Sequence, residues 1–189
     1  VGAKHGILFK TAASLERTGK TEIVALDKTG TITVGAPRVT DLCPAPGFTP
    51  QQLLQLACSL EQKSEHPLAQ AITIRAQADA LPTEEVTGFE ILPGNGLRAQ
   101  YRGRPALGGN AAFIGKFASL DDKTTCLAAQ LAAQGKTPLF FALDGKLAGL
   151  IAVADVIKDD SPDAIRQLQN MGIRVVMLTG DNKRTAQAI

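Results

Sequence analysis

The chain has 189 residues, 44% hydrophobic and 20% charged, a composition typical of one globular domain or two small ones rather than of a disordered segment. Its 20 basic and 18 acidic side chains leave a net charge of +2, which argues against nucleic-acid binding, because such proteins carry a marked basic excess. The longest apolar run, 147–154, is much shorter than the roughly 20 residues that cross a bilayer.

The cysteines and the amino-terminal residues indicate the compartment. Cys43, Cys58 and Cys126 are odd in number and lack the CxxC spacing of a metal site, so we expect reduced thiols. The first ten residues contain no apolar stretch like that of a signal peptide. These features predict a soluble, cytosolic chain.

Two apolar segments near the ends of the chain are predicted to be buried parallel strands, because neither alternates between apolar and polar residues. The first, 22–26, ends at Asp27, and the second, 173–178, ends at Thr179. In α/β folds, ligands gather beyond the carboxyl ends of such strands, so we expect both ends to contribute to a site.

A helix is predicted just before the second strand. Ser161 is a suitable N-cap, Pro162 suits the first helical position, and Gly172 would follow the end of the helix. A helix followed by a strand and a polar turn completes an α/β pattern.

The middle of the chain has a different pattern, in which helices precede clustered short strands and glycine-rich turns. We expect an α+β module inserted into the α/β domain, with edges near Pro37 and Gly149. The predicted elements are helices at 49–60, 65–80 (capped by Ser64) and 121–134, strands at 86–91, 97–101 and 105–107, and a hairpin of 137–143 with 146–153.

The strongest chemical signal is the sequence Asp27-Lys28-Thr29-Gly30-Thr31 at the end of the first strand. A carboxylate in this position can attack phosphorus and form an aspartyl-phosphate. Lys28 and a Mg²⁺ ion could neutralise charge, and the small residues 29–31 offer backbone N–H groups to the phosphoryl oxygens.

Several motifs make this sequence resemble the P-type ATPases, which have a haloacid-dehalogenase-like fold. DKTGT at 27–31 resembles their phosphorylation signature, and Thr179-Gly180-Asp181 resembles their TGD motif. SEHPL at 64–68 resembles a motif of the heavy-metal-transporting branch, and the glycines of 93–97 and 109–110 resemble the GxG and GN motifs of that branch.

The resemblance implies a Rossmann-like phosphorylation domain, incomplete here, that is interrupted by an α+β nucleotide-binding domain. The implied domains are 1–36 and 149–189 for phosphorylation and 37–148 for nucleotide binding. The implied catalytic residues are Asp27 as the phosphorylated nucleophile with Lys28, Thr29, Thr179, Gly180 and Asp181. The implied nucleotide-binding residues are Glu65, His66, Gly94, Gly96, Leu97, Gly109 and Asn110.

The same resemblance implies the cofactors and partners. ATP would bind the inserted domain, and Mg²⁺ would be held in part by the Asp27 carboxylate and the Thr29 carbonyl. The membrane helices, the metal-ligand motif, a lysine of the phosphorylation domain and the GDGxND motif of the family have no counterpart here. We therefore expect a segment on the cytoplasmic side of a membrane pump, with the pump's transmembrane domain as its partner, no nucleic acid, and a soft metal ion that this segment does not bind.

Thr29 distinguishes a pump from a phosphatase. Phosphatases of the wider fold carry a second Asp two residues after the nucleophile as general acid and base, and a threonine hydroxyl cannot replace it near neutral pH. We therefore expect a longer-lived aspartyl-phosphate, which gives a pump time to change conformation.

The sequence leaves the transported metal and the activity of the segment open. Copper export is favoured because 147–162 and 170–182 are most similar to the copper subgroup, while a zinc or cadmium pump stays open. A free-standing phosphohydrolase of the same fold and an isolated nucleotide-binding module without turnover also stay open.

Overall fold

The computed structural model describes residues 6–179, which form two compact units. The residues before Val34 combine with Ile157–Thr179 in the first unit, and Val34–Val156 form the second. The chain leaves the first unit close to the expected edge at Pro37. It returns later than the expected edge at Gly149, because β7 is one continuous strand, Lys146–Ile157. The assignment of phosphorylation and nucleotide binding to these units stays a prediction.

The first unit is built around two parallel strands, as the sequence predicted. Asp27, the last residue of one strand, lies opposite Leu178, the last residue of the other. The elements of this unit are α1 (Ala12–Thr18), β1 (Ile23–Asp27), the π-helical turn η2 (Lys28–Ile32), α6 (Ser161–Asn170) and β8 (Arg174–Leu178).

The prediction that both of these strands are buried is wrong for the described residues. Ile23, Val176 and Leu178 are 48%, 40% and 54% exposed. The physical reason is that α6 packs against β8, and the other helical segment with comparable contacts among the described residues is η2, the turn that directly follows β1. One layer of helix leaves alternate side chains of each strand in solvent.

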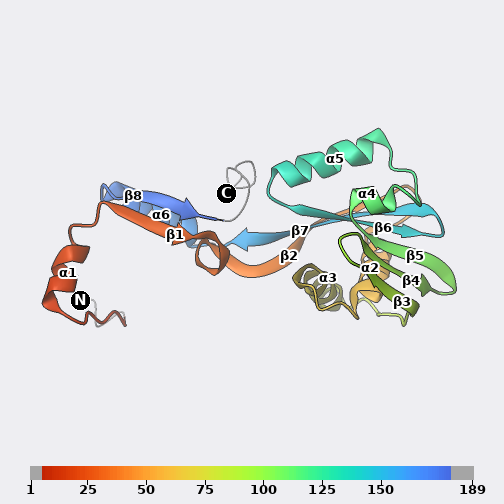
Figure 1. Ribbon diagram of the computed structural model, residues 1–189, viewed down its shortest axis with the longest axis horizontal. Helices are drawn as coiled ribbons and strands as arrows, with labels where there is room; N and C mark the ends of the chain where they lie inside the picture. Colours follow the sequence, from red (N-terminus) through yellow and green to blue (C-terminus); the bar gives the residue numbers. More distant parts are fainter. Residues whose placement is uncertain (1–5, 180–189) are drawn as a thin grey trace. The chain divides into compact units, whose positions relative to one another are not determined.

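The second unit is a six-stranded sheet in the order β2-β7-β6-β5-β4-β3, antiparallel from β7 to β3. Its strands are β2 (Thr33–Pro44), β3 (Thr87–Leu92), β4 (Gly96–Tyr101), β5 (Arg104–Gly109), β6 (Thr137–Leu143) and β7. Its helices are α2 (Pro50–Glu61), α3 (Pro67–Ala78), α4 (Ala111–Ile114) and α5 (Asp122–Ala133). Helices α4 and α5 cover one face of the sheet, and α2 and α3 lie on the other (Figure 1).

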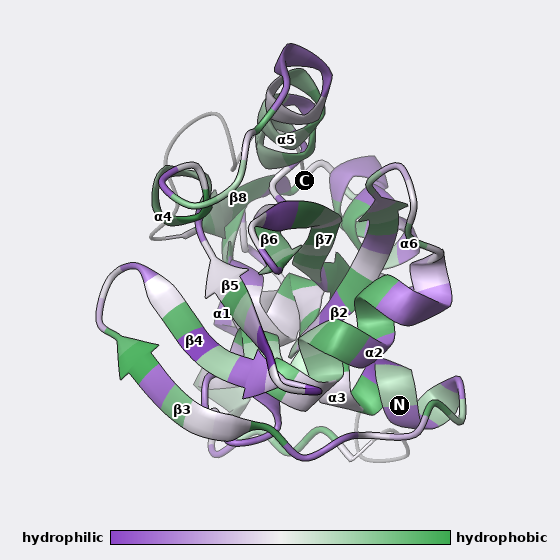
Figure 2. Ribbon diagram, turned by 90° about the vertical axis from the view of Figure 1, so that its right-hand side faces the viewer, coloured by the Kyte–Doolittle hydropathy of each residue, from purple (hydrophilic) through white to green (hydrophobic). Residues whose placement is uncertain are grey.

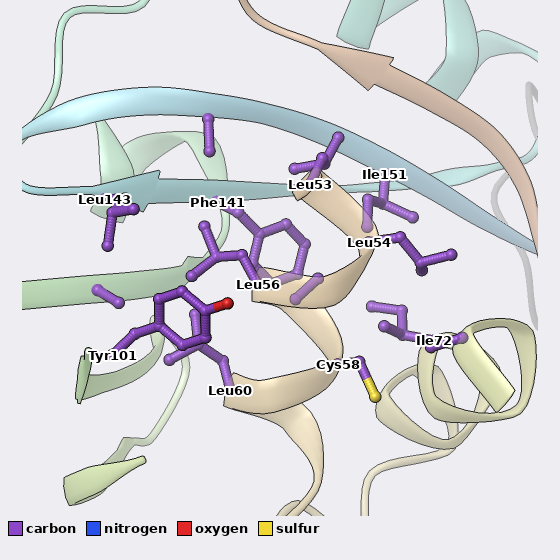
Figure 3. Close-up of a cluster of buried hydrophobic side chains, with 14 of the residues drawn as sticks. Leu53, Leu54, Leu56, Cys58, Leu60, Ile72, Tyr101, Phe141, Leu143 and Ile151 are labelled. Carbon is purple, nitrogen blue, oxygen red and sulfur yellow. The ribbon is translucent and has the colours of Figure 1, made fainter. Parts of the chain in front are cut away.

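Alternating side chains of the strands supply two cores, one for each face. Phe141 packs with the leucines of α2, whereas its neighbour Phe140 packs with Phe113 of α4 and Leu131 of α5. Figure 3 shows the first core, in which leucines of α2 face the sheet. The same alternation appears as bands along β4 in Figure 2. The helix–sheet core therefore provides a rigid support for the loops at the sheet's edges.

Four elements were not predicted from the sequence: α1, η2, β2 and α4. Gly35 and Pro37 suggest an interrupted segment, yet both lie inside β2. β2 is an edge strand, where a proline does not remove a bond from the middle of the ladder. The short helix α4 has four residues, too few to show a periodic pattern.

Two predicted helix starts are wrong by one or two residues. Asp160, not Ser161, is the N-cap of α6, and the Ser161 hydroxyl instead donates a buried 2.8 Å hydrogen bond to the carbonyl of Ile32. His66, not Ser64, is the N-cap of α3. The side chains of Ser64 and His66 can both accept a hydrogen bond from a backbone N–H group. The residue types alone therefore do not identify which of them caps α3. Among the helices of residues 6–179, none has the length and apolar character needed to span a membrane.

Candidate functional site

The second unit contains a cavity of about 540 Å³ at the ends of the helices α2 and α3. Three loops form it: the α2–α3 connection, the β3–β4 turn and the junction of β5 with α4. All seven nucleotide-binding residues implied by the resemblance line this cavity, namely Glu65, His66, Gly94, Gly96, Leu97, Gly109 and Asn110. The structure thus brings three separate motifs together, while their role in nucleotide binding stays a prediction.

The glycines allow two backbone segments to approach each other closely. A Cβ atom on Gly96 would lie 2.0 Å from the carbonyl oxygen of Gly108, and one on Gly109 would lie 2.4 Å from that of Asn95. Gly94 and Gly96 also have φ values of +74° and +154°, which side-chain-bearing residues rarely adopt. Only glycine therefore allows the backbone to form this wall of the cavity at such close approach.

Asn110 connects the two glycine loops of the cavity, which are the β3–β4 turn and the junction of β5 with α4. Its side-chain nitrogen donates a 3.0 Å hydrogen bond to the Gly94 carbonyl, and its backbone N–H donates to the Asn95 carbonyl at 3.1 Å. Its side-chain oxygen accepts a 2.8 Å bond from the N–H of Phe113 and so caps α4. Because both ends of the amide bond to the protein, Asn110 shapes the cavity by holding the loops.

His66 lines the cavity, and the residue is exposed to solvent. Its Nδ1 accepts a 3.2 Å hydrogen bond from the N–H of Leu68 and thereby caps α3. A neutral ring with an accepting Nδ1 carries its proton on Nε2, which can then donate to a ligand. The neighbouring Glu65 is also exposed and lines the same cavity.

Glu61 is a residue of the cavity wall that the sequence analysis missed. It is the last residue of α2 and only 8% exposed. Burial raises the pKa of its carboxyl group from the ordinary 4.5 to about 7, although a hydrogen bond with Ser64 opposes the rise. No cation pairs with it among the described residues. A buried carboxyl group facing a cavity can recognise a ligand amine or hydroxyl group.

A signal for Glu61 was present in the helix pattern. It lies four residues after Ala57 and seven after Leu54, and both of these side chains belong to the core. A glutamate on the apolar face of an amphipathic helix is unusual enough to mark a buried, functional carboxyl group.

The first unit carries the loop of the predicted nucleophile. Asp27 ends β1 and is exposed, and Gly30 has a φ of +76° within the turn. The Thr33 hydroxyl donates to the carbonyl of Lys28 at 2.9 Å and accepts from the N–H of Gly30 at 3.3 Å. The Thr33 hydroxyl therefore links two backbone groups of this turn and stabilises its conformation.

Thr179 lies at the same edge as Asp27, because it directly follows Leu178 in the parallel register. The remaining residues of the TGD motif, Gly180 and Asp181, lie outside the described residues. The carboxyl ends of the two strands thus gather two of the predicted phosphate-site segments, as the sequence analysis expected.

The loop after Asp27 carries oxygen atoms of the kind that Mg²⁺ binds. Mg²⁺ prefers oxygen and binds through one or two carboxylates together with substrate phosphates. The Asp27 carboxylate and the Thr29 carbonyl are two such oxygens on one loop. Among residues 6–179 there is no cluster of three histidine, cysteine or acidic side chains that could hold a metal alone.

A family model described as haloacid dehalogenase-like hydrolase matches residues 21–189. The chain belongs to this hydrolase family. The nucleophile of the predicted reaction, Asp27, lies near the start of the matched region.

Relatives and solved structures extend the family assignment. The chain is 44% identical over 188 residues to the copper-transporting ATPase 2 of Rhizobium meliloti (strain 1021) and 41% identical over 187 residues to the copper-exporting P-type ATPase of Bacillus subtilis (strain 168). Both matches cover 99% of this chain and 23% of the relative, so the chain spans about a quarter of their length.

A crystal structure of a zinc-transporting PIB-type ATPase in the E2.Pi state is similar with a TM-score of 0.90 and 40% identity. The match covers 99% of this chain and 30% of that one. The resemblance to heavy-metal P-type ATPases and the mixed α/β fold predicted from the motifs are confirmed.

Proposed function

We propose that this hydrolase-family chain is the ATP-binding and phosphorylation segment of a heavy-metal-translocating P-type ATPase that exports copper. The observation that carries the proposal is that Glu61 and three separate motifs line one cavity, in a chain that also holds the DKTGT loop. The segment would lie on the cytoplasmic side of a membrane, with the transmembrane part of the same pump as its partner.

The cavity has the groups that adenine recognition requires. The Glu61 carboxyl group accepts a hydrogen bond from the exocyclic amine of adenine, and the Nε2–H of His66 donates to a ring nitrogen or the ring stacks on the base. The backbone of Gly94 and Gly96 allows close approach of the nucleotide because no side chain intervenes. Guanine presents an oxygen instead of the amine, so ATP is favoured over GTP.

The chemical step belongs to Asp27. One oxygen of its carboxylate attacks the γ-phosphorus of ATP, the bond to the bridging oxygen breaks, and ADP leaves with that electron pair. Lys28 supplies positive charge, and Thr179 with Gly180 and Asp181 helps to hold the phosphoryl group. Mg²⁺, when bound, neutralises charge on the transferred group.

Thr29 leaves the aspartyl-phosphate without the general acid and base that phosphatases place two residues after the nucleophile. This argues against a free-standing phosphohydrolase. An isolated nucleotide-binding module without turnover would describe this segment alone, and turnover is proposed for the whole pump.

Copper is the proposed cargo because the relatives from Rhizobium meliloti and Bacillus subtilis are copper ATPases. Zinc is the second candidate because a zinc-transporting ATPase is 40% identical to the chain and has a closely similar fold. Stimulation of ATP hydrolysis by Cu⁺ and not by Zn²⁺, in membranes that contain the whole pump, supports copper, and the reverse supports zinc.

Calorimetric titration of the chain with ATP and, separately, GTP tests the nucleotide site. We expect ATP to bind, and His66→Ala to weaken this binding severalfold. The matched control is His66→Asn, which keeps a side-chain acceptor for the N-cap of α3 but removes the imidazole. Equal ATP affinities in the parent and both variants would remove His66 from the site, and a folded chain that binds no ATP would contradict the proposal.

A further inference from the structure

The segment from Lys158 to Ser161, which leads into α6, is hydrogen-bonded to the loop that follows Asp27. The ammonium group of Lys158 donates a 2.8 Å hydrogen bond to the carbonyl of Gly30. The backbone N–H of Lys158 donates at 3.0 Å to the carbonyl of Ile32, and the Ser161 hydroxyl donates to the same oxygen at 2.8 Å. Three bonds from one short segment thus converge on two loop carbonyls.

Two of these bonds are unusual for a lysine and a serine at a helix start. Ser161 is 8% exposed and uses its hydroxyl to bind the loop instead of capping α6, which has no side-chain cap at Asp160. Lys158 is partly buried, and its ammonium bonds to a carbonyl rather than to a carboxylate in the described contacts. The side chains of both residues therefore bind backbone carbonyls of the loop after Asp27.

The bond from Lys158 sets the direction of a peptide group next to the nucleophile. A trans peptide unit is planar, and its C=O and N–H groups point in opposite directions. Because Lys158 holds the carbonyl of Gly30, the N–H of Thr31 in the same peptide unit faces away from Lys158. Gly30 has a φ of +76°, and a Cβ added to it would meet no atom within 4 Å, so packing does not fix this residue from that side.

We propose that Lys158 and Ser161 are positioning residues for phosphoryl transfer, holding the carbonyls of Gly30 and Ile32 so that the N–H groups of the loop face the phosphoryl group on Asp27. Neither residue touches the transferred group. This inference rests on the proposed function, since it concerns the same aspartyl-phosphate. Well-oriented donors matter because small misplacements of such a loop cost up to about a hundredfold in rate.

The experiment uses the whole pump in membranes and measures the rate constant of Asp27 phosphorylation by ATP in a rapid-mixing single turnover. We expect Lys158→Met to lower this rate constant at saturating ATP by about tenfold or more, and Ser161→Ala by about threefold or more. The ATP concentration at half-maximal rate should change less than about twofold, because the cavity lies in the other unit. Lys158→Arg, which keeps a donor, should recover most of the rate.

The matched control is Lys20→Met, which removes an exposed ammonium of the same unit that pairs only with Glu16 among the described contacts. A purely structural role would reduce the amount of phosphorylated protein without changing the rate constant per site, and that result overturns the inference. A rate constant within about twofold of the parent in both Lys158→Met and Ser161→Ala also overturns it. If Lys158→Met does not fold, Ser161→Ala and Lys158→Arg carry the test. Absence of any Asp27-dependent phosphorylation in the parent overturns the proposed function and the inference with it.

Discussion

Replacing the buried Glu61 with glutamine should make the chain more stable at alkaline pH and leave it nearly unchanged in acid. A carboxyl group whose pKa is raised on folding stabilises the folded chain in its protonated form. This stabilisation is complete below the ordinary pKa of 4.5 and is lost as the pH rises through the folded value of about 7. Above that pH the protein holds a charged carboxylate on a residue that is only 8% exposed to water.

The size of the effect follows from the two pKa values. One pKa unit corresponds to about 1.4 kcal/mol, so a rise from 4.5 to about 7 corresponds to roughly 3 kcal/mol as an upper estimate. Glutamine has nearly the same shape as a protonated glutamate but never ionises. The Glu61→Gln variant should therefore lie within about 1 kcal/mol of the parent at about pH 5 and exceed it by about 2–3 kcal/mol at about pH 8.

Urea unfolding of the parent and the variant at several pH values between about 5 and 8 measures this difference directly. Glu65→Gln is the matched control, since it removes an exposed carboxyl group from the same loop. Any other titratable groups contribute equally to both proteins and cancel in the difference. A Glu61→Gln difference that stays constant within about 0.5 kcal/mol across this pH range would refute the reasoning.

Two further predictions concern the glycine turn and the phosphorylation loop. Gly96→Ala should weaken ATP binding about tenfold or more in calorimetric titration, because the new Cβ would lie 2.0 Å from the Gly108 carbonyl oxygen and must push the two loops apart. Gly94→Ala is its control, since a Cβ there meets no atom within 4 Å and only the backbone is strained; equal losses in both variants would show that contact plays no part. Thr29→Asp in the whole pump should speed loss of the aspartyl-phosphate, because it supplies the missing general acid and base. A phosphoenzyme lifetime unchanged by this substitution, in a chase with unlabelled ATP, would count against that role of Thr29.

Most of the helices and strands could be predicted from the sequence because their patterns are local. Continuous apolar runs ending at Asp27 and Leu178 predict the parallel pair, and the turn at Asp144-Gly145 predicts the hairpin of β6 and β7. β2 could not be predicted, because Pro37 is acceptable in a strand mainly at the edge of a sheet, and edge position depends on the partners of the strand.

The candidate site was likewise predicted only in part. Short motifs identify His66 and the glycines, but they do not identify Glu61, whose role depends on the wall of a folded cavity. The exposure of Ile23 and Val176 likewise depends on which layers cover the strands, and apolar composition alone does not reveal this.

The same use of side chains to hold backbone recurs at both candidate sites. Asn110 uses both ends of its amide to hold the glycine loops of the cavity, and Lys158 uses its backbone and its ammonium to hold the loop of Asp27. In each case the side chain fixes the backbone of a loop that the motifs single out. Backbone N–H groups held in this way need no reorganisation when charge arrives, which is the condition for strong electrostatic stabilisation of a transferred phosphoryl group. We therefore expect the backbone of these loops, more than the side chains around them, to supply the ligand contacts.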